Sequence, residues 1–420
     1  MPMRSVRSLS AHSAMSERLE TRLAAREVAE TLHAASSSRP DVLFVFASFH
    51  HRALLSDGLD VLRHALHPSH LLATTVESAV WNDREIERKP SLSVLALHAP
   101  GIVARPFWFD LNDGPPAVWG NELIRQRVSL PPDEGVPAGT QAGAHGGALE
   151  HRATILIADP FSLHPGDACA AIDAAAGPCG ARIHGGIASG ANHAGLNVLA
   201  VDRHVANAGI VGLSIFGDIE VSGLVSQGCR PIGKPLVVTR GHGNEILELN
   251  GRAATETIQE AVAELRESER ALLGQGLLMG IALDASKELL GRGDFLVRPV
   301  LAVDPARGSV SISDRVRAGM TVRLQIRDRA TADDDLAMML DAEQLRDPVS
   351  AALLFTCNAR GTSMFGTPDH DASMLRRRLG GMPLSGFQCA GEIGPHGARS
   401  FVHTQTASAV LFRQARWSRK

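Results

Sequence analysis

Three short apolar runs, widely separated along the chain, constrain the fold of this protein more than any other feature. They span residues 42–46, 153–158 and 351–356, and runs of this length are typical of strands buried within a sheet. Each run is followed by a segment with helical spacing and then by a second strand, so the order of elements restarts twice. The sequence therefore predicts an α/β or α+β fold, with mixed β-sheets flanked by helices.

The second strand of each unit ends in small residues. The three segments cover residues 72–80, 183–191 and 384–392. A Gly-x4-Gly spacing recurs in the last two, and the first has Thr74 and Ala79 at those places. Small residues at a strand end let a backbone or a ligand approach closely, although a tight turn without a ligand fits the pattern equally well. We predict degenerate strand–helix–strand repeats.

Further elements follow from periodicity and from turn residues. The sequence predicts helices over residues 15–35, 54–66, 167–176, 255–273, 333–345 and 373–379. It predicts further strands over residues 71–76, 92–97, 182–187, 198–200, 211–215, 384–389 and 407–412, and β structure over 308–323. A loop rich in Gly, Pro and Ala, at about 135–149, is expected to be flexible.

Composition narrows the class of function. The 42 Lys and Arg residues nearly balance the 45 Asp and Glu residues, and aromatic residues make up 4%. This gives no electrostatic footprint for nucleic acid and few rings on which bases could stack. Five cysteines without a Cys-x-x-Cys pair favour a reducing compartment. With no long apolar run and no signal peptide, we expect a cytoplasmic protein without membrane insertion.

Several motifs resemble those of the bacterial FIST proteins. In the N-terminal part they are residues 41–48 and 91–97, and the most specific is Ser226-Gln227-Gly228-Cys229-Arg230-Pro231-Ile232-Gly233, followed by residues 237–239. In the C-terminal part they are residues 355–361 and 386–395, in this order and about 30 residues apart. The resemblance covers about residues 38–412, and Val80 departs from the family pattern, in which a Gly-Glu ending is common.

The resemblance implies a division of the chain and a role. It implies an N-terminal helix and tail over 1–37, a FIST N domain over 38–244, a FIST C domain over 245–412 and a basic tail over 413–420. The family is proposed to sense small ligands, such as amino acids, in signal transduction. We therefore expect a small-molecule ligand and an unidentified downstream signalling protein as partners.

Two charged residues are candidate ligand contacts. Arg360 follows one strand of the third unit, and Glu392 follows the next. If these strands are neighbours, their ends present one positive and one negative group to a single cleft, which suits a zwitterion. Gly391 and Cys357, in the same motifs, belong to this predicted site. Alternatively, Arg360 and Glu392 form a structural pair with each other.

Other candidate groups leave two further hypotheses open. Arg230 is a second candidate anion contact, or a structural arginine of its loop. Cys357 or Cys389 could serve as the nucleophile of a thiol-dependent enzyme, although a buried cysteine is usually inert. The protein could also be an interaction scaffold without a ligand. No catalytic motif, cofactor fingerprint or standard metal-ligand spacing is recognisable, so we expect no enzyme activity, no cofactor and no metal.

Overall fold

A computed structural model of the chain describes residues 8–130, 149–287 and 289–415. These residues form two compact units, one of which is inserted in the sequence of the other. The first unit comprises residues up to 225, residues 338–402 and residues from 407 onwards, and the second comprises residues 226–337 and 403–406. The loop predicted at 135–149 lies, apart from its last residue, outside the described residues.

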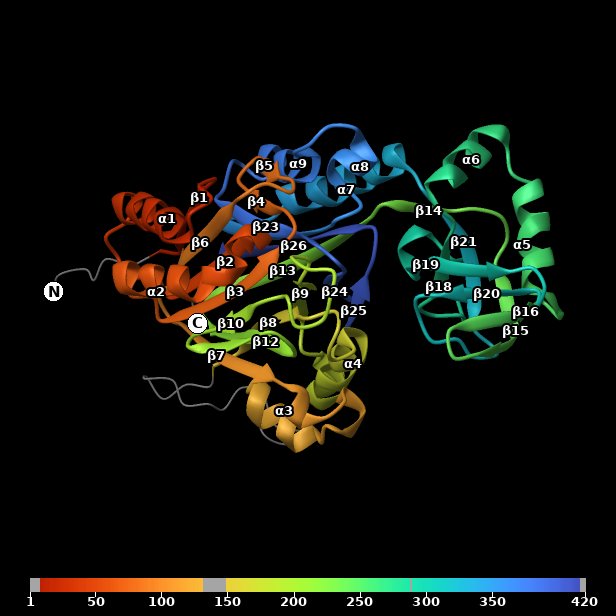
Figure 1. Ribbon diagram of the computed structural model, residues 1–420, viewed down its shortest axis with the longest axis horizontal. Coiled ribbons are helices and arrows are strands. Elements are labelled where there is room, and N and C mark those ends of the chain that lie inside the picture. Colours follow the sequence, from red (N-terminus) through yellow and green to blue (C-terminus); the bar gives the residue numbers. More distant parts are fainter. Residues whose placement is uncertain (1–7, 131–148, 288, 416–420) are drawn as a thin grey trace. The chain divides into compact units, whose positions relative to one another are not determined.

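The first unit contains three six-stranded sheets (Figure 1). In spatial order, the first sheet consists of β1 (Ser10–Ser16), β6 (Leu92–His98), β2 (Val42–Ser48), β3 (His70–Val76), β10 (Leu199–Val201) and β11 (His204–Ala206). The second consists of β7 (Ile102–Phe109), β12 (Ile210–Gly217), β8 (His151–Ala158), β9 (Ile183–Ile187), β24 (Glu392–His396) and β25 (Arg399–His403). The third consists of β13 (Ile219–Gln227), β26 (Thr406–Gln414), β22 (Ala351–Cys357), β23 (Leu384–Cys389), β4 (Ala79–Trp81) and β5 (Arg84–Ile86).

The three sheets share one plan. Each has a parallel pair at its centre, namely β2 with β3, β8 with β9, and β22 with β23. The strands within each pair end together, because Ser48 lies opposite Val76, Ala158 opposite Ile187, and Cys357 opposite Cys389. The predicted mixed sheets and strand–helix–strand repeats are therefore confirmed.

After each parallel pair, the chain leaves its own sheet to complete another. The hairpin β4–β5 follows β3 in the sequence but pairs with β23 of the third sheet. The hairpin β10–β11 follows β9 but pairs with β3 of the first sheet. Likewise, β24 and β25 follow β23 but extend the second sheet beside β9. Each sheet is thus complete only when another repeat has folded beside it.

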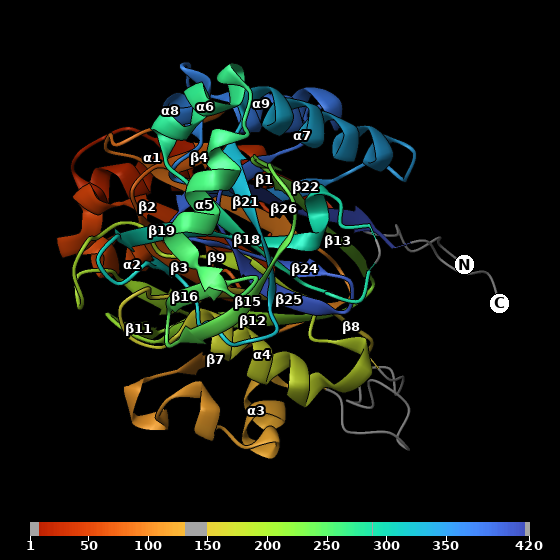
Figure 2. The same ribbon diagram turned by 90° about the vertical axis from the view of Figure 1, so that its right-hand side faces the viewer.

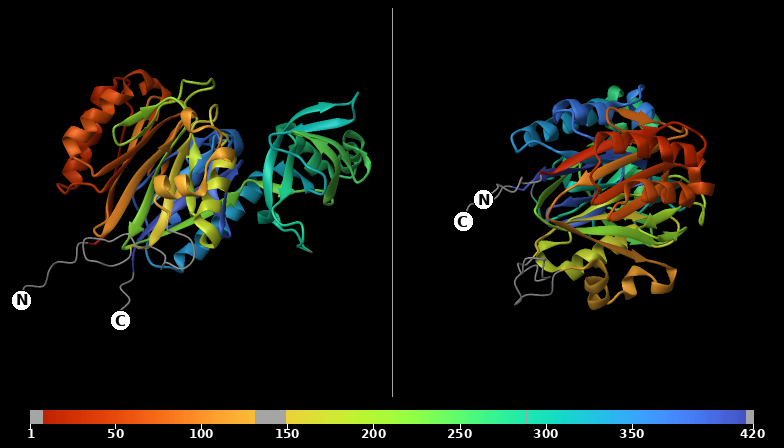
Figure 3. Two further views of the ribbon diagram at one scale, coloured as in Figure 1. Left: turned by 90° about the horizontal axis from the view of Figure 1, so that it is seen from below. Right: turned by 90° about the vertical axis from the view of Figure 1, so that its left-hand side faces the viewer.

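Helices cover the outer faces of the sheets. The α-helices of this unit are α1 (Thr21–Ala35), α2 (Leu55–Leu66), α3 (Asn121–Val128), α4 (Pro165–Ala176), α8 (Gly361–Phe365), α9 (His370–Arg378) and the C-terminal part of α7 (Arg329–Gln344), from residue 338 onwards. Figures 2 and 3 show α7, α8 and α9 on one side of the unit, α3 and α4 on the opposite side, and α1 and α2 against the first sheet. Short 3₁₀ turns of this unit are η1 (Phe49–Leu54), η2 (Leu111–Asp113), η3 (Pro116–Val118) and η4 (Gly177–Cys179), and those of the second unit are η5 (Leu273–Gln275) and η6 (Arg292–Asp294).

One hydrophobic core joins the three sheets. It contains Phe46 from the first sheet, Ile155 from the second, and Phe355 and Phe387 from the third, all fully buried. The three phenylalanine rings contact one another with centroid separations of 5.1, 5.5 and 6.2 Å. Because protein interiors are close-packed, this shared core fixes the strand ends of all three repeats relative to one another.

The second unit is an antiparallel barrel with its own core. Strands β21 (Thr321–Arg327), β15 (Leu236–His242), β16 (Glu245–Leu249), β20 (Ser309–Ile312), β19 (Phe295–Asp304) and β18 (Leu278–Ala282) pair in this order, and β18 pairs back with β21. Strands β14 (Cys229–Pro231) and β17 (Arg252–Ala253) pair with β21 and β16, and the helices are α5 (Ala254–Ala263) and α6 (Glu267–Leu272). The boundary expected between residues 244 and 245 falls between β15 and β16, inside the second compact unit.

Three local predictions need correction. The helix predicted over 15–35 begins at Thr21 with Glu20 as its N-cap, because residues 10–16 instead form β1 and pair with β6. The helix predicted over 255–273 is two helices, α5 and α6. The predicted basic tail does not begin at Arg413, which is fully buried in β26 with its Nη2 2.6 Å from Oε2 of Glu343.

None of the helices in the described parts of the chain combines the length and the apolar character needed to cross a membrane.

The small residues of the predicted repeat have a structural cause at two equivalent places. Gly185 lies opposite Leu156, and Gly386 lies opposite Leu354, in the parallel pairs of the second and third sheets. A Cβ atom at either glycine would lie 1.8 or 1.9 Å from the carbonyl oxygen of its partner. Gly185 also has a φ of +146°, which residues with a Cβ rarely adopt.

We expect Gly185→Ala and Gly386→Ala each to lower the free energy of unfolding by more than about 2 kcal/mol, because backbone atoms must move to admit the methyl group. Chemical denaturation of each purified variant measures this change. Gly166→Ala in α4 is the control, since its Cβ would meet only the exposed ring of His164 and should leave stability unchanged or improved. A loss of the same size in the control would contradict the explanation.

Candidate functional site

The ends of β3, β9 and β23 meet at one point of the first unit. The Ser189 hydroxyl, just after β9, donates a hydrogen bond to the carbonyl oxygen of Gln388 in β23. The same hydroxyl accepts a hydrogen bond of 3.0 Å from the backbone N–H of Glu77, which follows β3. One side chain therefore ties together all three repeats at the carboxyl ends of their parallel strands, where α/β sheets commonly bind ligands.

A cluster of polar side chains surrounds this junction, and we call Glu77, Arg88, Ser189 and Asn358 the rim cluster. Arg88 Nε donates to Glu77 Oε1 at 2.7 Å, and Asn358 Nδ2 lies 3.4 Å from Glu77 Oε2. The Arg88 side chain is 76% exposed and that of Glu77 is 28% exposed. Ser189 is half-buried and Asn358 is exposed. The rim cluster thus offers one positive and one negative side chain to solvent, together with the hydroxyl of Ser189 and the amide of Asn358.

Arg360 lies in a buried ion pair with Asp371. Its Nε and Nη2 atoms donate to the two carboxylate oxygens at 2.7 and 2.8 Å, and both side chains are fully buried. Thr356 Oγ1 donates to the same carboxylate at 2.6 Å. Although burial by itself raises the pKa of Asp371, the Arg360 guanidinium and these hydrogen bonds lower it overall. Arg360 Nη1 is buried and has no hydrogen-bond partner among the described residues.

A second buried acid lies beside this ion pair. Glu85 in β5 is 3% exposed, and its Oε1 accepts a hydrogen bond of 3.0 Å from the Ala372 backbone N–H. Burial, and then the neighbouring charge of Asp371, raise the pKa of Glu85 to about 8. The hairpin β4–β5 brings Glu85 to this place by crossing from the first repeat to the third. The buried acids Glu85 and Asp371 therefore favour opposite protonation states at neutral pH.

Glu392, which the sequence analysis placed beside Arg360, lies in the second sheet. Strands β22 and β23 are neighbours, as the sequence analysis required, but the chain then departs from β23 towards the second sheet. Glu392 consequently pairs with Gly186 in β9 and is fully buried. Arg360 is bound to Asp371, so the structural pair of Arg360 with Glu392 is not the one that forms. Gly391 is also buried, and its carbonyl oxygen accepts a hydrogen bond of 2.8 Å from Ile187 N.

The two motif cysteines lie opposite each other at the ends of β22 and β23. Cys357 is 5% exposed and Cys389 is fully buried. Burial, followed by the charge of Glu392, raises the pKa of the Cys389 thiol well above its ordinary value. A nucleophilic cysteine acts as the thiolate, so this environment disfavours catalysis by Cys389.

Arg230 belongs to the second unit and has two acidic partners. It lies in β14, with Nη1 2.8 Å from Glu269 Oε1 and Nε 3.0 Å from Asp328 Oδ2. The hydrogen bond to Glu269, with that to Asp328, raises the pKa of this guanidinium. Two carboxylates occupy the positions that an anionic ligand would take, which agrees with the structural alternative for Arg230.

The structure adds residues that the sequence analysis did not select. Glu77 and Ser189 lie within the repeat segments 72–80 and 183–191, so the pattern of small residues marked the segments but not these two side chains. Asp371 and Glu85 gave no such signal. Their distances from Arg360 along the chain follow no helical or strand periodicity, and only the crossing of the β4–β5 hairpin brings Glu85 near.

Comparisons with known proteins assign most of the chain to families. A sequence model of the FIST N domain matches residues 41–252, and a model of the FIST C domain matches residues 254–395. An uncharacterized protein of Mycobacterium tuberculosis (strain CDC 1551 / Oshkosh) is 34% identical over 394 residues, covering 93% of this chain and 96% of that protein. One of Mycobacterium bovis is 35% identical over 385 residues, covering 89% of this chain and 90% of that protein.

Among solved structures, a cyanuric acid hydrolase from A. caulinodans aligns with 97% of this chain and 100% of its own. The sequence identity is 7% and the TM-score is 0.35, which is too low to carry an argument about fold or activity.

The raised pKa of Glu85 predicts a pH-dependent stability. Because the folded state holds this proton more tightly than the unfolded state, the contribution is complete below the ordinary pKa of 4.5 and is lost as the pH rises through about 8. Between pH 5 and 8, the free energy of unfolding of the wild type should fall relative to that of Glu85→Gln by more than about 1 kcal/mol. Denaturation at several pH values measures this. The control Glu30→Gln, at an exposed position, should follow the wild type, and parallel curves for all three proteins would refute the assignment.

The buried ion pair predicts a large cost for removing one partner. Asp371→Asn leaves the Arg360 charge buried without its counter-ion and should lower the free energy of unfolding by about 3–5 kcal/mol. Asp341→Asn is the matched control, because Asp341 pairs with Arg378 at the surface, with side chains 53% and 38% exposed. Removing such an exposed pair should cost less than about 1 kcal/mol. Similar losses in the two variants would show that the Arg360–Asp371 pair is not a determinant of stability.

Proposed function

The chain belongs to the FIST family, whose general role is sensory binding of small ligands, and on this premise we propose that it binds a small zwitterion such as an amino acid at the rim cluster. The observation that carries the proposal is the meeting of Glu77, Ser189 and Asn358, one from each repeat, beside the exposed Arg88. The sensor works in the cytoplasm and passes its signal to a protein partner.

The Glu77–Arg88 ion pair is suited to receive a ligand that carries both charges. Exposed ion pairs contribute only about 0–1 kcal/mol, so separating this one costs little. A zwitterion inserted between the two side chains replaces one ion pair by two, with its ammonium group on the Glu77 carboxylate and its carboxylate on the Arg88 guanidinium. Arginine binds carboxylates through two parallel hydrogen bonds, which orients the ligand as well as holding it.

Neutral groups of the rim cluster fit the same ligand. The amide of Asn358 lies beside Glu77 and can accept from the ammonium group through its oxygen. The Ser189 hydroxyl holds the Glu77 backbone in place, so the carboxylate that meets the ammonium group is oriented before binding. A site prepared in this way loses less conformational entropy when the ligand binds.

Arg360, Glu392, Gly391 and Cys357 support the site without touching the ligand. The backbone N–H of Arg360 donates to Cys357 O at 2.8 Å, and that of Asn358 donates to Cys389 O at 2.9 Å. The bond between Arg360 and Asp371 anchors the loop that carries Asn358. We therefore assign these residues a positioning role. Arg230, with two carboxylates of the second unit around it, has no part in this site.

The proposed function is not enzymatic. The high pKa of Cys389 disfavours a thiolate at that residue, which leaves Cys357 as the nucleophile of the alternative thiol-dependent activity. An interaction scaffold without a ligand is the other alternative, and it is an outcome of the binding experiment.

A thermal-shift screen of the purified protein against the amino acids tests the proposal. A ligand that binds only the folded state, present at about 100 times its Kd, stabilises it by roughly 2.7 kcal/mol and so raises the Tm. We expect at least one amino acid to raise the Tm of the wild type, and Glu77→Gln and Arg88→Gln to abolish the shift.

The matched controls are Glu17→Gln and Arg84→Gln. These residues form another exposed ion pair of the first unit, with 3.0 Å between Arg84 Nη1 and Glu17 Oε1, and neither belongs to the rim cluster. Both controls should keep the wild-type shift. A shift that survives in Glu77→Gln and Arg88→Gln would move the ligand to another site, whereas no shift with any amino acid would favour the scaffold.

A further inference from the structure

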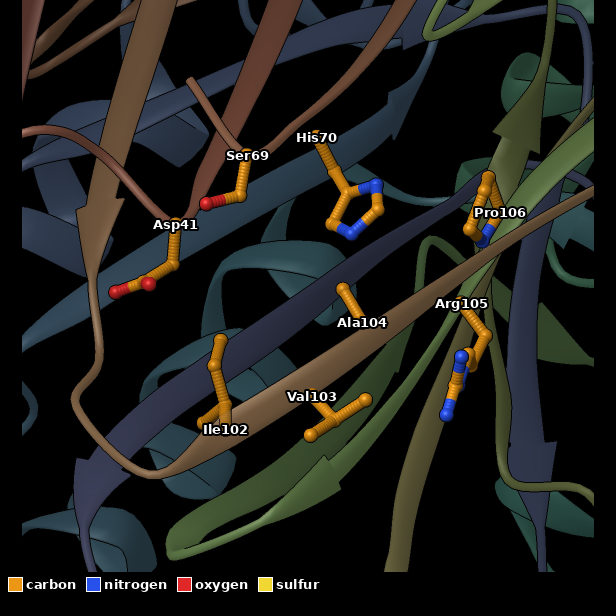
Figure 4. A pocket seen from close by; sticks show the side chains of 8 residues that line it. All are labelled: Asp41, Ser69, His70, Ile102, Val103, Ala104, Arg105 and Pro106. Carbon is orange, nitrogen blue, oxygen red and sulfur yellow. The ribbon is translucent and has the colours of Figure 1, made fainter. Parts of the chain in front are cut away.

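Two adjoining pockets lie at the opposite end of strand β3 from the rim cluster. The smaller, of about 320 Å³, is bounded by Ser69 and His70, by residues 102–106 of β7 and by Asp41, whose Oδ2 accepts a hydrogen bond of 2.7 Å from the Ala99 backbone N–H (Figure 4). The larger, of about 570 Å³, is also bounded by Ser69 and His70, so the two pockets share a wall. Because His70 begins β3 and the rim cluster follows the end of that strand, this region is separate from the proposed zwitterion site.

Three arginines and a histidine from different parts of the chain line the larger pocket. Arg39 precedes β2, Arg63 and His67 lie at the end of α2, and Arg203 lies in the turn between β10 and β11. The Asp202 carboxylate is already engaged, because it accepts hydrogen bonds from the Leu71 backbone N–H at 2.9 Å and lies 3.0 Å from His70 Nδ1.

Two of these arginines are available to a ligand. Arg63 is held by Asp60 at 2.8 Å and by the carbonyl oxygen of Asp202. Arg39 and Arg203 are exposed, and within the described parts of the chain neither has an ion-pair partner. The C-terminal end of α2 attracts cations through its helix dipole, which accounts for Arg63 and His67. It does not account for Arg39 and Arg203, which come from other elements.

The turn that carries Arg203 is firmly held. Asp202 has a φ of +50°, and both its carboxylate and its carbonyl oxygen are bonded to neighbouring elements. The pinned turn places Arg203 at the pocket that Arg39 also lines, so both charges border one pocket before any ligand arrives. A multivalent anion in this pocket would be attracted by both charges.

We propose that the larger pocket binds the phosphate group of a small phosphorylated molecule. The planar guanidinium groups of Arg39 and Arg203 match phosphate oxygens through paired hydrogen bonds, and His67 and the Ser69 hydroxyl add donors. The neighbouring pocket, walled by Ile102, Val103 and Ala104, receives the remainder of the molecule (Figure 4). The chain has a net charge of −3, so general attraction of anions to the whole protein does not explain such binding.

Inorganic pyrophosphate is the probe, and isothermal titration calorimetry of the full-length protein measures its affinity. We expect saturable binding of one pyrophosphate per chain, weakened about tenfold or more in Arg39→Gln and in Arg203→Gln, because each removes a charge-assisted hydrogen-bonding group. The variants change exposed side chains, so their unfolding midpoints should match that of the wild type.

Arg377→Gln is the matched control. Arg377 is an exposed arginine of α9 outside both pockets, and its replacement changes the net charge by the same amount. This variant should bind pyrophosphate as the wild type does. An equal loss in Arg377→Gln would reduce the effect to net charge, and no binding of pyrophosphate to the wild type would overturn the proposal. Neither result bears on amino-acid binding, because Glu77 and Arg88 are unchanged in all these proteins.

Discussion

The exchange of hairpins among the three sheets is the constraint on which the rest of the first unit depends. Each parallel pair is bordered on one side by a hairpin from a different repeat, and all three sheets bury side chains in one core. A repeat on its own would expose one strand edge and one apolar face, both of which are costly in water. The fold is therefore cooperative across the repeats, and the ends of the parallel strands occupy defined positions around Ser189.

The same exchange explains the distribution of buried charge. The hairpin β4–β5 carries Glu85 to the third repeat, where it lies beside the Arg360–Asp371 pair, while the departure of the chain after β23 carries Glu392 to the second sheet. A buried charge is tolerated when partners satisfy it, and Asp371 receives hydrogen bonds from both Arg360 and Thr356. This network lies beneath the loop that presents Asn358, so it links the interior of the third repeat to the rim cluster.

Strand β3 connects the two regions for which we propose ligands. Its carboxyl end leads to Glu77 and the rim cluster, where opposite charges are close together and exposed. Its amino end begins at His70, beside a pocket in which exposed arginines exceed the available acids. The two regions differ in their charge balance, and this difference separates a zwitterionic ligand from a phosphorylated one. The strand itself is almost fully buried.

The sequence by itself determined the strand–helix–strand units, the mixed sheets and the family, because buried strands and strand-end glycines leave local patterns. Positions 185 and 386 require glycine, because a Cβ atom at either place would collide with the backbone of the neighbouring strand. The sequence left open whether β22 and β23 are neighbours, as the structure shows them to be, and which groups meet beyond them. Only the tertiary structure decided that Arg360 binds Asp371, that Glu392 joins β9, and that Glu77 and Ser189 meet. The physical reason is that these contacts arise between segments that pair across repeats, and no periodicity within one segment encodes its partner in another.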